Sequence, residues 1–358
     1  MPEILLTIFF ISVLLFFLGS GIWVALSMIG VSAIGMMLFT SRPVGDAMAT
    51  TIWGTSSSWT LTALPLFVWM GEILFRTKLS ENLFRGLSPW MQKLPGGLIH
   101  VNVVGCALFA AISGSSAATV ATVGKMSIPE LRKRKYPEKI LLGSLAGSGT
   151  LGLLIPPSII LIIYGVAVQE SIAKLFIAGI IPGIMIALIF MSYVIVWSLI
   201  NKKEMPKIIE EYSFFEKLKR SKQLLPVILL ISAVIGSIYS GIATATEAAS
   251  LGVVGALVLS FFQKSLNIKT FKSSLMGATK TSCMIAFILA GSTFLSLAMG
   301  FTGLPRNLAI WIESMNLSPY VLIFALMVFY IILGMFLDGI SAVVLTMAII
   351  EPMIRQAG

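Results

Sequence analysis

Four consecutive small residues interrupt a strongly apolar stretch and are the first candidates for chemistry: Ser113, Gly114, Ser115 and Ser116. Hydroxyl and backbone carbonyl oxygens are hard, neutral ligands that suit a small hard cation. Glycine and hydroxyl residues at membrane depth leave carbonyl groups available to an ion, provided that protein or water surrounds them. Simple packing of small residues between membrane helices is the alternative interpretation.

The same pattern recurs 225 positions later, in residues 337–345. The two copies match at three small residues, pairing Gly114 with Gly339, Ser116 with Ser341 and Ala117 with Ala342. Each copy follows a long apolar run, and each lies downstream of an amphipathic segment that contains tryptophan. Two copies in matching context favour an ion-binding site over packing alone.

Asp338 precedes the second glycine and is one of two aspartates in the chain. An isolated carboxylate at membrane depth is costly enough to indicate a functional role. Capping the N-terminus of a half-helix is a second role for this side chain, and the two roles are compatible. Asp338, Gly339 and Ser341 therefore form a second candidate ion site.

The elements that must position these residues are membrane helices. The chain has 358 residues, of which 57% are hydrophobic and 11% charged, and its mean hydropathy is +0.99. This balance excludes a soluble domain and indicates a polytopic integral membrane protein. The net charge of +10 lies in short loops between apolar runs, which follows the positive-inside rule and does not indicate nucleic-acid binding. Cys106 and Cys283 lie in apolar runs and favour neither a disulfide nor a metal site.

Residues 98–123 are apolar apart from their central break, and they are too long for one short helix. They are better explained as two half-helices of a re-entrant hairpin than as one span. Residues 76–93 and 125–139 flank the hairpin, and both are basic, so a hairpin that turns back leaves both on the inner side. We expect residues 76–93 to form an amphipathic helix along the membrane surface.

Residues 140–164 are predicted to cross the membrane as a broken helix. Gly149 and Thr150 precede a run of Pro156, Pro157 and Ser158. Two prolines remove two backbone donors and free carbonyl groups upstream, so the helix must break near mid-membrane. A simple kink is the alternative, but the flanking glycine and hydroxyl residues favour an ion or substrate site that faces the hairpin.

Counting the spans places the first hairpin on the basic side of the membrane and the second on the opposite side. The sequence therefore predicts an all-α polytopic membrane protein with inverted-topology repeats, two re-entrant helical hairpins and broken helices. The predicted segments are residues 1–94 (spans and a surface helix), 95–165 (first hairpin and broken helix), 166–318 (spans and a second surface segment) and 319–358 (second hairpin). Matching the two repeats requires about 65 residues beyond residue 358, so we expect the second repeat to be truncated in this chain.

Three motifs carry a resemblance to a known family: GTLGLLIPPS at 149–158, ATEAA at 245–249 and LGMFLDGIS at 333–341. Together they resemble the large membrane subunit of tripartite ATP-independent periplasmic (TRAP) transporters, over essentially the whole chain. The resemblance implies sodium-coupled uptake of an organic anion, such as a C4-dicarboxylate, another carboxylic acid or sialic acid, by an elevator movement of a transport domain. It also implies a small four-helix membrane subunit, a periplasmic substrate-binding protein and a bacterial or archaeal cytoplasmic (inner) membrane. Neither a cofactor besides the coupling ion nor an enzymatic activity is implied.

Under this resemblance the candidate sodium ligands are Ser113, Gly114, Ser115, Ser116, Gly149, Thr150 and Pro156 at the first site, with Asp338, Gly339 and Ser341 at the second. A substrate carboxylate is expected to be held by half-helix N-termini at the hairpin tips. The candidate substrate-binding residues are Ser115, Ser116, Ala117, Pro157, Ser158 and Ser341. Within the apolar segments no arginine or lysine is evident as a counter-ion for the substrate.

Two other functions remain open from the sequence. The first is a sodium/anion symporter that works alone, without a binding protein. The second is an intramembrane enzyme or assembly factor, but an enzyme needs paired acids, a serine–histidine or serine–lysine pair, or a metal cluster. We find no such group in the spans. His100 is the only histidine and begins an apolar run, and Asp338 is alone at membrane depth. A channel is disfavoured, because two separately broken elements suit alternating access.

Overall fold

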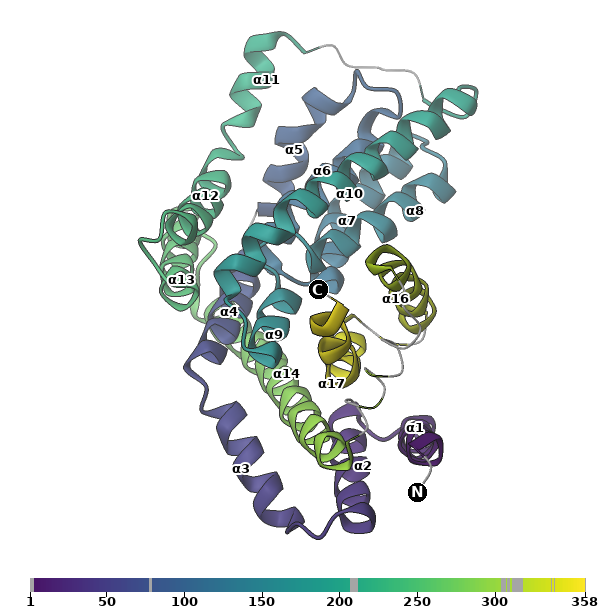
Figure 1. Cartoon of the computed structure of the whole chain (residues 1–358). Coiled ribbons are helices and arrows are strands. Elements are labelled where there is room, and N and C mark those ends of the chain that lie inside the picture. Colours follow the sequence, from purple (N-terminus) through teal and green to yellow (C-terminus); the bar gives the residue numbers. More distant parts are fainter. Residues whose placement is uncertain are drawn as a thin grey trace. The chain divides into compact units, whose positions relative to one another are not determined.

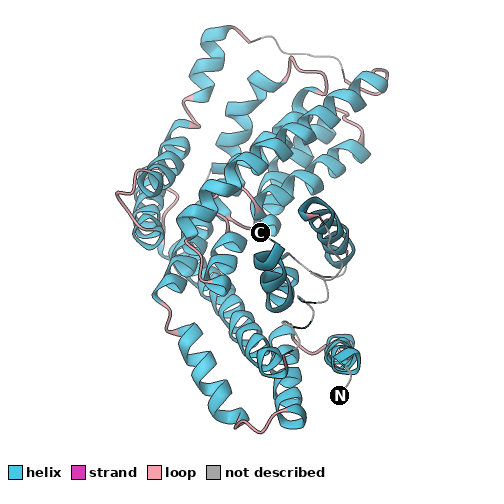
Figure 2. Cartoon of the chain, viewed as in Figure 1, coloured by secondary structure: helices cyan, strands magenta, loops and turns pink. Residues whose placement is uncertain are grey.

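The computed structural model describes residues 3–76, 79–206, 212–303, 307, 310, 318–335, 337 and 339–357. Every regular element in these residues is a helix (Figures 1 and 2). In chain order the elements are α1 (Glu3–Gly19), α2 (Val24–Phe39), α3 (Val44–Ser56), η1 (Trp59–Thr62), α4 (Ala63–Phe75), α5 (Leu79–Met91), η2 (Gly97–Ile99), α6 (His100–Ser113), α7 (Ser116–Lys133), α8 (Glu138–Gly149), η3 (Thr150–Leu153), α9 (Ile159–Val168), α10 (Ile172–Ile200), α11 (Phe214–Ser221), α12 (Leu225–Tyr239), α13 (Ala245–Phe262), α14 (Ile268–Thr302), α16 (Pro319–Gly334) and α17 (Gly339–Ala357).

Several of these helices have the length and composition of membrane spans. In the described part of the chain α10, α13 and α14 are each long and apolar enough to be a span, and the number reaches at most five if each bent pair, α3 with η1–α4 and α11 with α12, counts as one span. The bends are 52° and 57°. Shorter apolar helices of 10–17 residues include α2, α9 and α16. The predicted class, an all-α polytopic membrane protein, is confirmed.

Two compact units make up the chain, and each is described by itself. Unit 1 comprises Met1–Leu61, Ile163–Glu170 and Ser282–Gly358, whereas unit 2 comprises Thr62–Ile162 and Ser171–Thr281. In unit 1 a buried cluster of Met36, Phe294 and Ala298 joins α2 to α14. In unit 2 the centre of the packing is α6.

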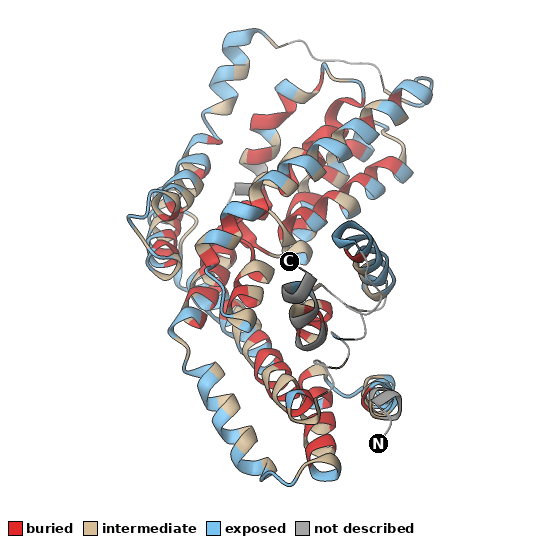
Figure 3. Cartoon of the chain, viewed as in Figure 1, coloured by how far each residue is buried: buried red, intermediate tan, exposed pale blue. Residues whose placement is uncertain are grey.

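Helix α6 is apolar around most of its circumference, so burial on all sides is its stable arrangement. Most of its 14 residues are buried (Figure 3), and it packs against α4, α5, α7, α8 and α10. One of its clusters joins Val103 and Ala110 to Leu151 of η3, with Phe190 of α10 covering the group. The first interrupted segment is therefore the core of unit 2.

The connection from α5 to α6 turns sharply at two glycines in the left-handed region, Gly96 (φ 102°) and Gly97 (φ 54°). Beyond the turn, the Leu98 amide donates to the Tyr136 hydroxyl (3.0 Å), and the buried His100 ring places Nε2 2.8 Å from the Pro95 carbonyl. Burial raises the pKa of the Tyr136 hydroxyl above its usual range, although the Leu98 amide and the Arg134 charge act in the opposite direction. These contacts fix where α6 begins.

One predicted boundary differs from the structure. The hairpin was expected to end at residue 123, but α7 continues to Lys133 through the basic segment. This segment is amphipathic, since Ser127 and Leu131 are buried while Glu130 pairs with Arg134 one turn away (2.8 Å). The second predicted surface segment falls mostly outside the described residues, although α14 reaches Thr302.

Close helix packing in unit 2 also depends on Gly252 of α13. A Cβ atom there would lie 2.5 Å from the Met70 sulfur of α4 and 3.2 Å from Val234 Cγ2 of α12. Replacing Gly252 with leucine overpacks this contact, so we expect the free energy of unfolding to fall by about 1–3 kcal/mol.

The measurement is thermal unfolding of the purified chain in detergent. The matched control is Gly143→Leu, because a Cβ atom added at Gly143 of α8 meets nothing within 4 Å. Equal melting temperatures for the two variants would contradict the packing argument.

Candidate functional site: a hairpin tip packed on a helix break

The first interrupted segment reverses direction within two residues. Helix α6 ends at Ser113, and Gly114 takes the left-handed conformation (φ 58°), which a side chain would disfavour. Ser115 is extended and caps α7, since its hydroxyl accepts from the Ala118 amide (3.4 Å). The predicted interruption is thus present, as two antiparallel helices joined at a tip.

Hydroxyl groups hold this tip together. The Thr119 hydroxyl donates to the Ser115 carbonyl (2.7 Å), which also accepts from the Thr119 amide (3.0 Å). Because a threonine hydroxyl has one proton, Ser113 Oγ then donates to Thr119 Oγ1 across 2.9 Å. Each of these two hydroxyl oxygens keeps a lone pair. Ser113 and Thr119 are both buried, so those lone pairs lie in a largely dry site.

The helix break that precedes α9 lies directly against the tip. Residues 154–158 between η3 and α9 are not helical and include a cis peptide bond between Pro156 and Pro157. The Ile159 amide donates to the Gly114 carbonyl (3.3 Å). Ser158 is fully buried, and its hydroxyl donates to the Leu153 carbonyl (2.5 Å). Residues of the break therefore donate hydrogen bonds to one carbonyl group of the break itself and to one of the hairpin.

Two glycines let the backbones of the tip and the break meet. A Cβ at Gly114 would lie 2.9 Å from both the Pro157 carbonyl oxygen and the Ile159 nitrogen. A Cβ at Gly152 would lie 2.8 Å from the Ser115 carbonyl carbon and 3.0 Å from the Ser116 nitrogen. No side chain fits at either position without displacing the partner backbone.

The predicted residues of the first site separate into two groups. The residues at the tip lie close to Gly149. A Cβ atom added at Gly149 would lie 3.7 Å from the Ser116 carbonyl oxygen. Thr150 is instead exposed and donates to the Gly147 carbonyl (2.6 Å), while Ala117 is exposed at the start of α7. Thr119 and Gly152 were missed by the sequence analysis. Thr119 could have been found from its spacing, because it lies one helical turn after Ser115.

The second interrupted segment lies in unit 1, between α16 and α17. Gly339 begins α17, and Ser341 and Ala342 are buried in its first turn. Asp338 lies outside the described residues. Farther along α17, Ser292 of α14 donates to the Val344 carbonyl (2.5 Å), and Thr346 forms a hydrogen bond with Tyr330 of α16 (2.6 Å).

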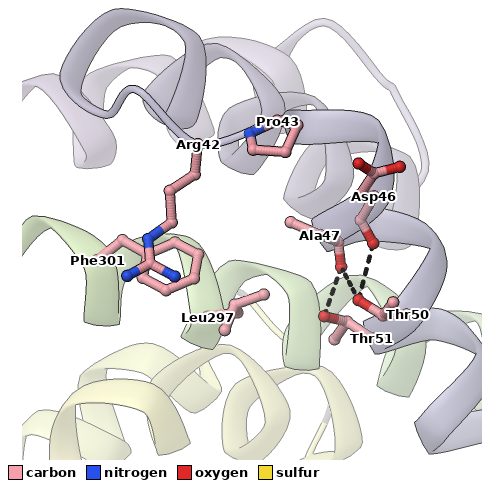
Figure 4. A pocket seen from close by; sticks show the side chains of 8 residues that line it. All are labelled: Arg42, Pro43, Asp46, Ala47, Thr50, Thr51, Leu297 and Phe301. Carbon is pink, nitrogen blue, oxygen red and sulfur yellow. Dashed lines mark hydrogen bonds between the residues drawn. The ribbon is translucent and has the colours of Figure 1, made fainter.

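A surface hollow of unit 1 is separate from the predicted residues (Figure 4). Its lining consists of Arg42, Pro43, Asp46, Ala47, Thr50, Thr51, Leu297 and Phe301. The Arg42 guanidinium lies over the Phe301 ring, 4.4 Å from its centroid. Thr50 and Thr51 donate to carbonyl groups of their own helix (both 2.7 Å), so their protons do not point at a ligand.

The chemistry of the tip is that of neutral oxygen ligands. The described candidate residues contain hydroxyls, carbonyls and amides but no ionisable side chain. Across the described residues, no three His, Cys, Asp or Glu side chains gather as a metal-ion site would require. The arrangement suits a weakly held, hard monovalent cation better than a transition metal.

Comparison with known proteins identifies the family. Residues 9–358 match the model of the tripartite ATP-independent periplasmic transporter, DctM component. The C4-dicarboxylate TRAP transporter large permease protein DctM of Pseudomonas aeruginosa is 32% identical, over 91% of this chain and 76% of that protein. The sialic acid TRAP transporter large permease protein SiaM of Vibrio cholerae is 30% identical, over 95% and 79% of the two chains.

A third relative is the 2,3-diketo-L-gulonate TRAP transporter large permease protein YiaN of Escherichia coli. It is 30% identical over 87% of this chain and 73% of the relative. These relatives are transporters, and the resemblance inferred from the three motifs is confirmed. The chain belongs to the DctM component family of tripartite ATP-independent periplasmic transporters, as a large permease subunit.

Proposed function

We propose that this subunit carries an organic acid across the bacterial cytoplasmic (inner) membrane by symport with sodium. Family membership supports transport, and the named cargoes of three relatives are organic acids: a C4-dicarboxylate, sialic acid and 2,3-diketo-L-gulonate. The observation that carries the sodium part of the proposal is the buried oxygen cluster at the hairpin tip, packed on the helix break.

The proposed sodium ligands are the lone pairs of Ser113 Oγ and Thr119 Oγ1, with Ser116 and carbonyl oxygens of the tip completing the shell. Support comes from their burial and from the 2.9 Å separation of the two hydroxyl oxygens. The Ser116 hydroxyl is half-buried and makes no hydrogen bond to another described residue. Thr150 is the weakest member of the predicted set, because its hydroxyl is exposed and bonded to Gly147.

The substrate carboxylate is proposed to bind at the N-terminus of α7. The amides of Ser116 and Ala117 precede the first intrahelical hydrogen bond, and the helix dipole favours an anion there. Ala117 is exposed, which gives a ligand access. Pro157 and Ser158 are buried, and the Pro157 carbonyl lies against Gly114, so these two residues are proposed to support the tip and not to contact the cargo. The corresponding residues of the second hairpin, Ser341 with Asp338 and Gly339, remain candidates for a second site.

The proposed movement is an elevator motion of hairpins and broken helices against the other spans. In unit 2 the tip and the break are joined by backbone contacts, which supports their moving as one body. The two left-handed glycines between α5 and α6 provide a place where that body can pivot. In this proposal the predicted segments 95–165 and 319–358 form the transport domain, 1–94 and 166–318 form the scaffold, and the two halves are inverted repeats.

The proposed partners are a small four-helix membrane subunit and a periplasmic substrate-binding protein. The relatives' designation as large permease proteins supports the existence of a smaller membrane subunit. The family description names a tripartite, periplasmic system, which supports a soluble third component outside the inner membrane. A transporter of this design takes its cargo from the binding protein, so uptake requires all three components.

The first test replaces hydroxyl groups at the tip. In proteoliposomes holding both membrane subunits and supplied with the binding protein, Ser113→Ala or Thr119→Val removes one proposed sodium ligand. A lost ligand is worth about 1–3 kcal/mol, so the sodium concentration for half-maximal uptake of labelled organic acid rises about fivefold or more.

The matched control for the hydroxyl test is Ser260→Ala in α13. Ser260 is fully buried, and its hydroxyl donates to the Ala256 carbonyl (2.7 Å), so the control removes a buried hydroxyl elsewhere. Uptake that does not depend on sodium would refute symport. An equal rise in the sodium concentration for half-maximal uptake in the control and tip variants would refute the assignment of the tip hydroxyls as ligands. Uptake without the binding protein would support a carrier that works alone.

The second test adds one carbon atom between the tip and the break. Gly152→Ala places a Cβ 2.8 Å from the Ser115 carbonyl carbon, so the backbones must separate and sodium-driven uptake is expected to fall at least about tenfold. The control is Gly236→Ala in α12, where a Cβ meets nothing within 4 Å. Unchanged uptake by the Gly152 variant would show that transport does not need this contact.

A further inference from the structure

A short helix at one end of unit 2 has no buried residue. Helix α11 begins with a capping box in which the Ser213 amide donates to Glu216 Oε2 (3.0 Å), and it runs to Ser221. It then bends by 57° into the apolar helix α12. Figure 3 shows α11 as exposed or intermediate along its length, in contrast to the buried core helices of the same unit.

The three large apolar side chains of α11 lie on one face. Phe214, Phe215 and Leu218 fall within an arc of about 100° at 3.6 residues per turn. Their exposed fractions are 69%, 76% and 49%. Lys217 and Lys219 border this face on either side, and Arg220 lies opposite it. Apolar side chains bordered by long cations are typical of a helix that lies in the plane of a membrane interface.

Helix α5 holds α11 in this orientation. The Trp90 indole nitrogen donates to the Ser221 hydroxyl (2.7 Å), and the Trp90 and Phe214 rings pack edge to face at 6.2 Å. The Lys217 ammonium lies 5.6 Å from the centre of the Trp90 ring. At 3.6 residues per turn Ser221 lies about 20° from Phe214, about 60° from Leu218 and about 120° from Phe215. Helix α5 therefore lies beside the Phe214 edge of the apolar face, and Phe215, at the other edge, is turned farthest from α5.

Charge decides what can cover that face. Residues 212–222 contain four cations (Lys217, Lys219, Arg220 and Lys222) against Glu216, whose carboxylate is used by the helix cap. Cations are expensive in the hydrocarbon core, so α11 does not continue the α12 span. A cluster of four or more cations beside a span attracts anionic lipid headgroups.

We propose that α11, braced by Trp90, is a membrane-surface anchor that binds anionic phospholipid headgroups. Phe214, Phe215 and Leu218 enter the boundary between headgroups and acyl chains, while Lys217, Lys219 and Arg220 reach the phosphate groups. The partner is the anionic leaflet of the bilayer. The anchor sets the depth of α12 and α5, independently of which cargo is carried.

The first experiment locates the helix. An environment-sensitive fluorophore is attached to Phe215→Cys in the full chain carrying Cys283→Ser, since Cys106 is buried and does not react. Brominated phosphatidylglycerol in nanodiscs of phosphatidylcholine is expected to quench it more than brominated phosphatidylcholine does. The control label is Ile242→Cys, in the exposed loop between α12 and α13, where the two lipids should quench equally.

The second experiment measures affinity. Bound phosphatidylglycerol is counted by native mass spectrometry for the chain and for the triple variant Lys217→Gln, Lys219→Gln, Arg220→Gln. Each cation near the surface is worth about 1 kcal/mol, a factor of about five, so the affinity is expected to fall at least about tenfold. Thermal unfolding verifies that the variant is folded.

The matched control removes three cations elsewhere, with Lys202→Gln, Lys203→Gln and Lys264→Gln. An equal loss of affinity in this control would overturn the proposal, because only total charge would then matter. Equal quenching of the Phe215 label by both lipids would also overturn it. So would a label that becomes shielded only when the small membrane subunit is added, since a protein would then cover the face.

Discussion

The structure of unit 2 depends on a rule of the membrane interior: each backbone polar group must find a partner within the protein. A helix broken at mid-span violates that rule unless another element satisfies the freed groups. Here the break between η3 and α9 and the break between α6 and α7 satisfy one another, through the hydrogen bond from the Ile159 amide to the Gly114 carbonyl. Two further carbonyl groups accept hydrogen bonds from side chains nearby, that of Ser115 from Thr119 at the tip and that of Leu153 from Ser158 at the break. Each interruption therefore supplies a hydrogen-bonding partner to the other.

Burial of α6 follows from the same constraint. Its tip can remain dry only if protein surrounds it, and the apolar surface of α6 recruits α4, α5, α7, α8 and α10 for that purpose. The result is a polar oxygen cluster inside an apolar shell, where a cation could exchange water for protein oxygens. The described tip contains no charged side chain, so the proposed sodium site rests on neutral oxygens alone.

Much of this could be predicted from the sequence, because glycine and proline break helices wherever they occur. Gly114 and the Pro156–Pro157 pair marked both interruptions, and the apolar runs marked the spans. The sequence could not show which hydroxyls converge, since that depends on the angle between α6 and α7. Thr150 therefore turned out to face outward and Thr119 inward. Nor could periodicity show that α7 extends to Lys133, because a basic amphipathic segment is compatible with both helix and loop.

The meeting of Gly114 and Gly152 with their partner backbones bears on how this family diversifies. Main-chain atoms are the same in every protein, so a junction made from them carries no information about cargo. Relatives named for a dicarboxylate, for sialic acid and for a diketo sugar acid can therefore share the junction unchanged. Under the proposed function, selection for a new cargo is free to act on the exposed residues at the start of α7 and leaves the rigid junction of tip and break intact.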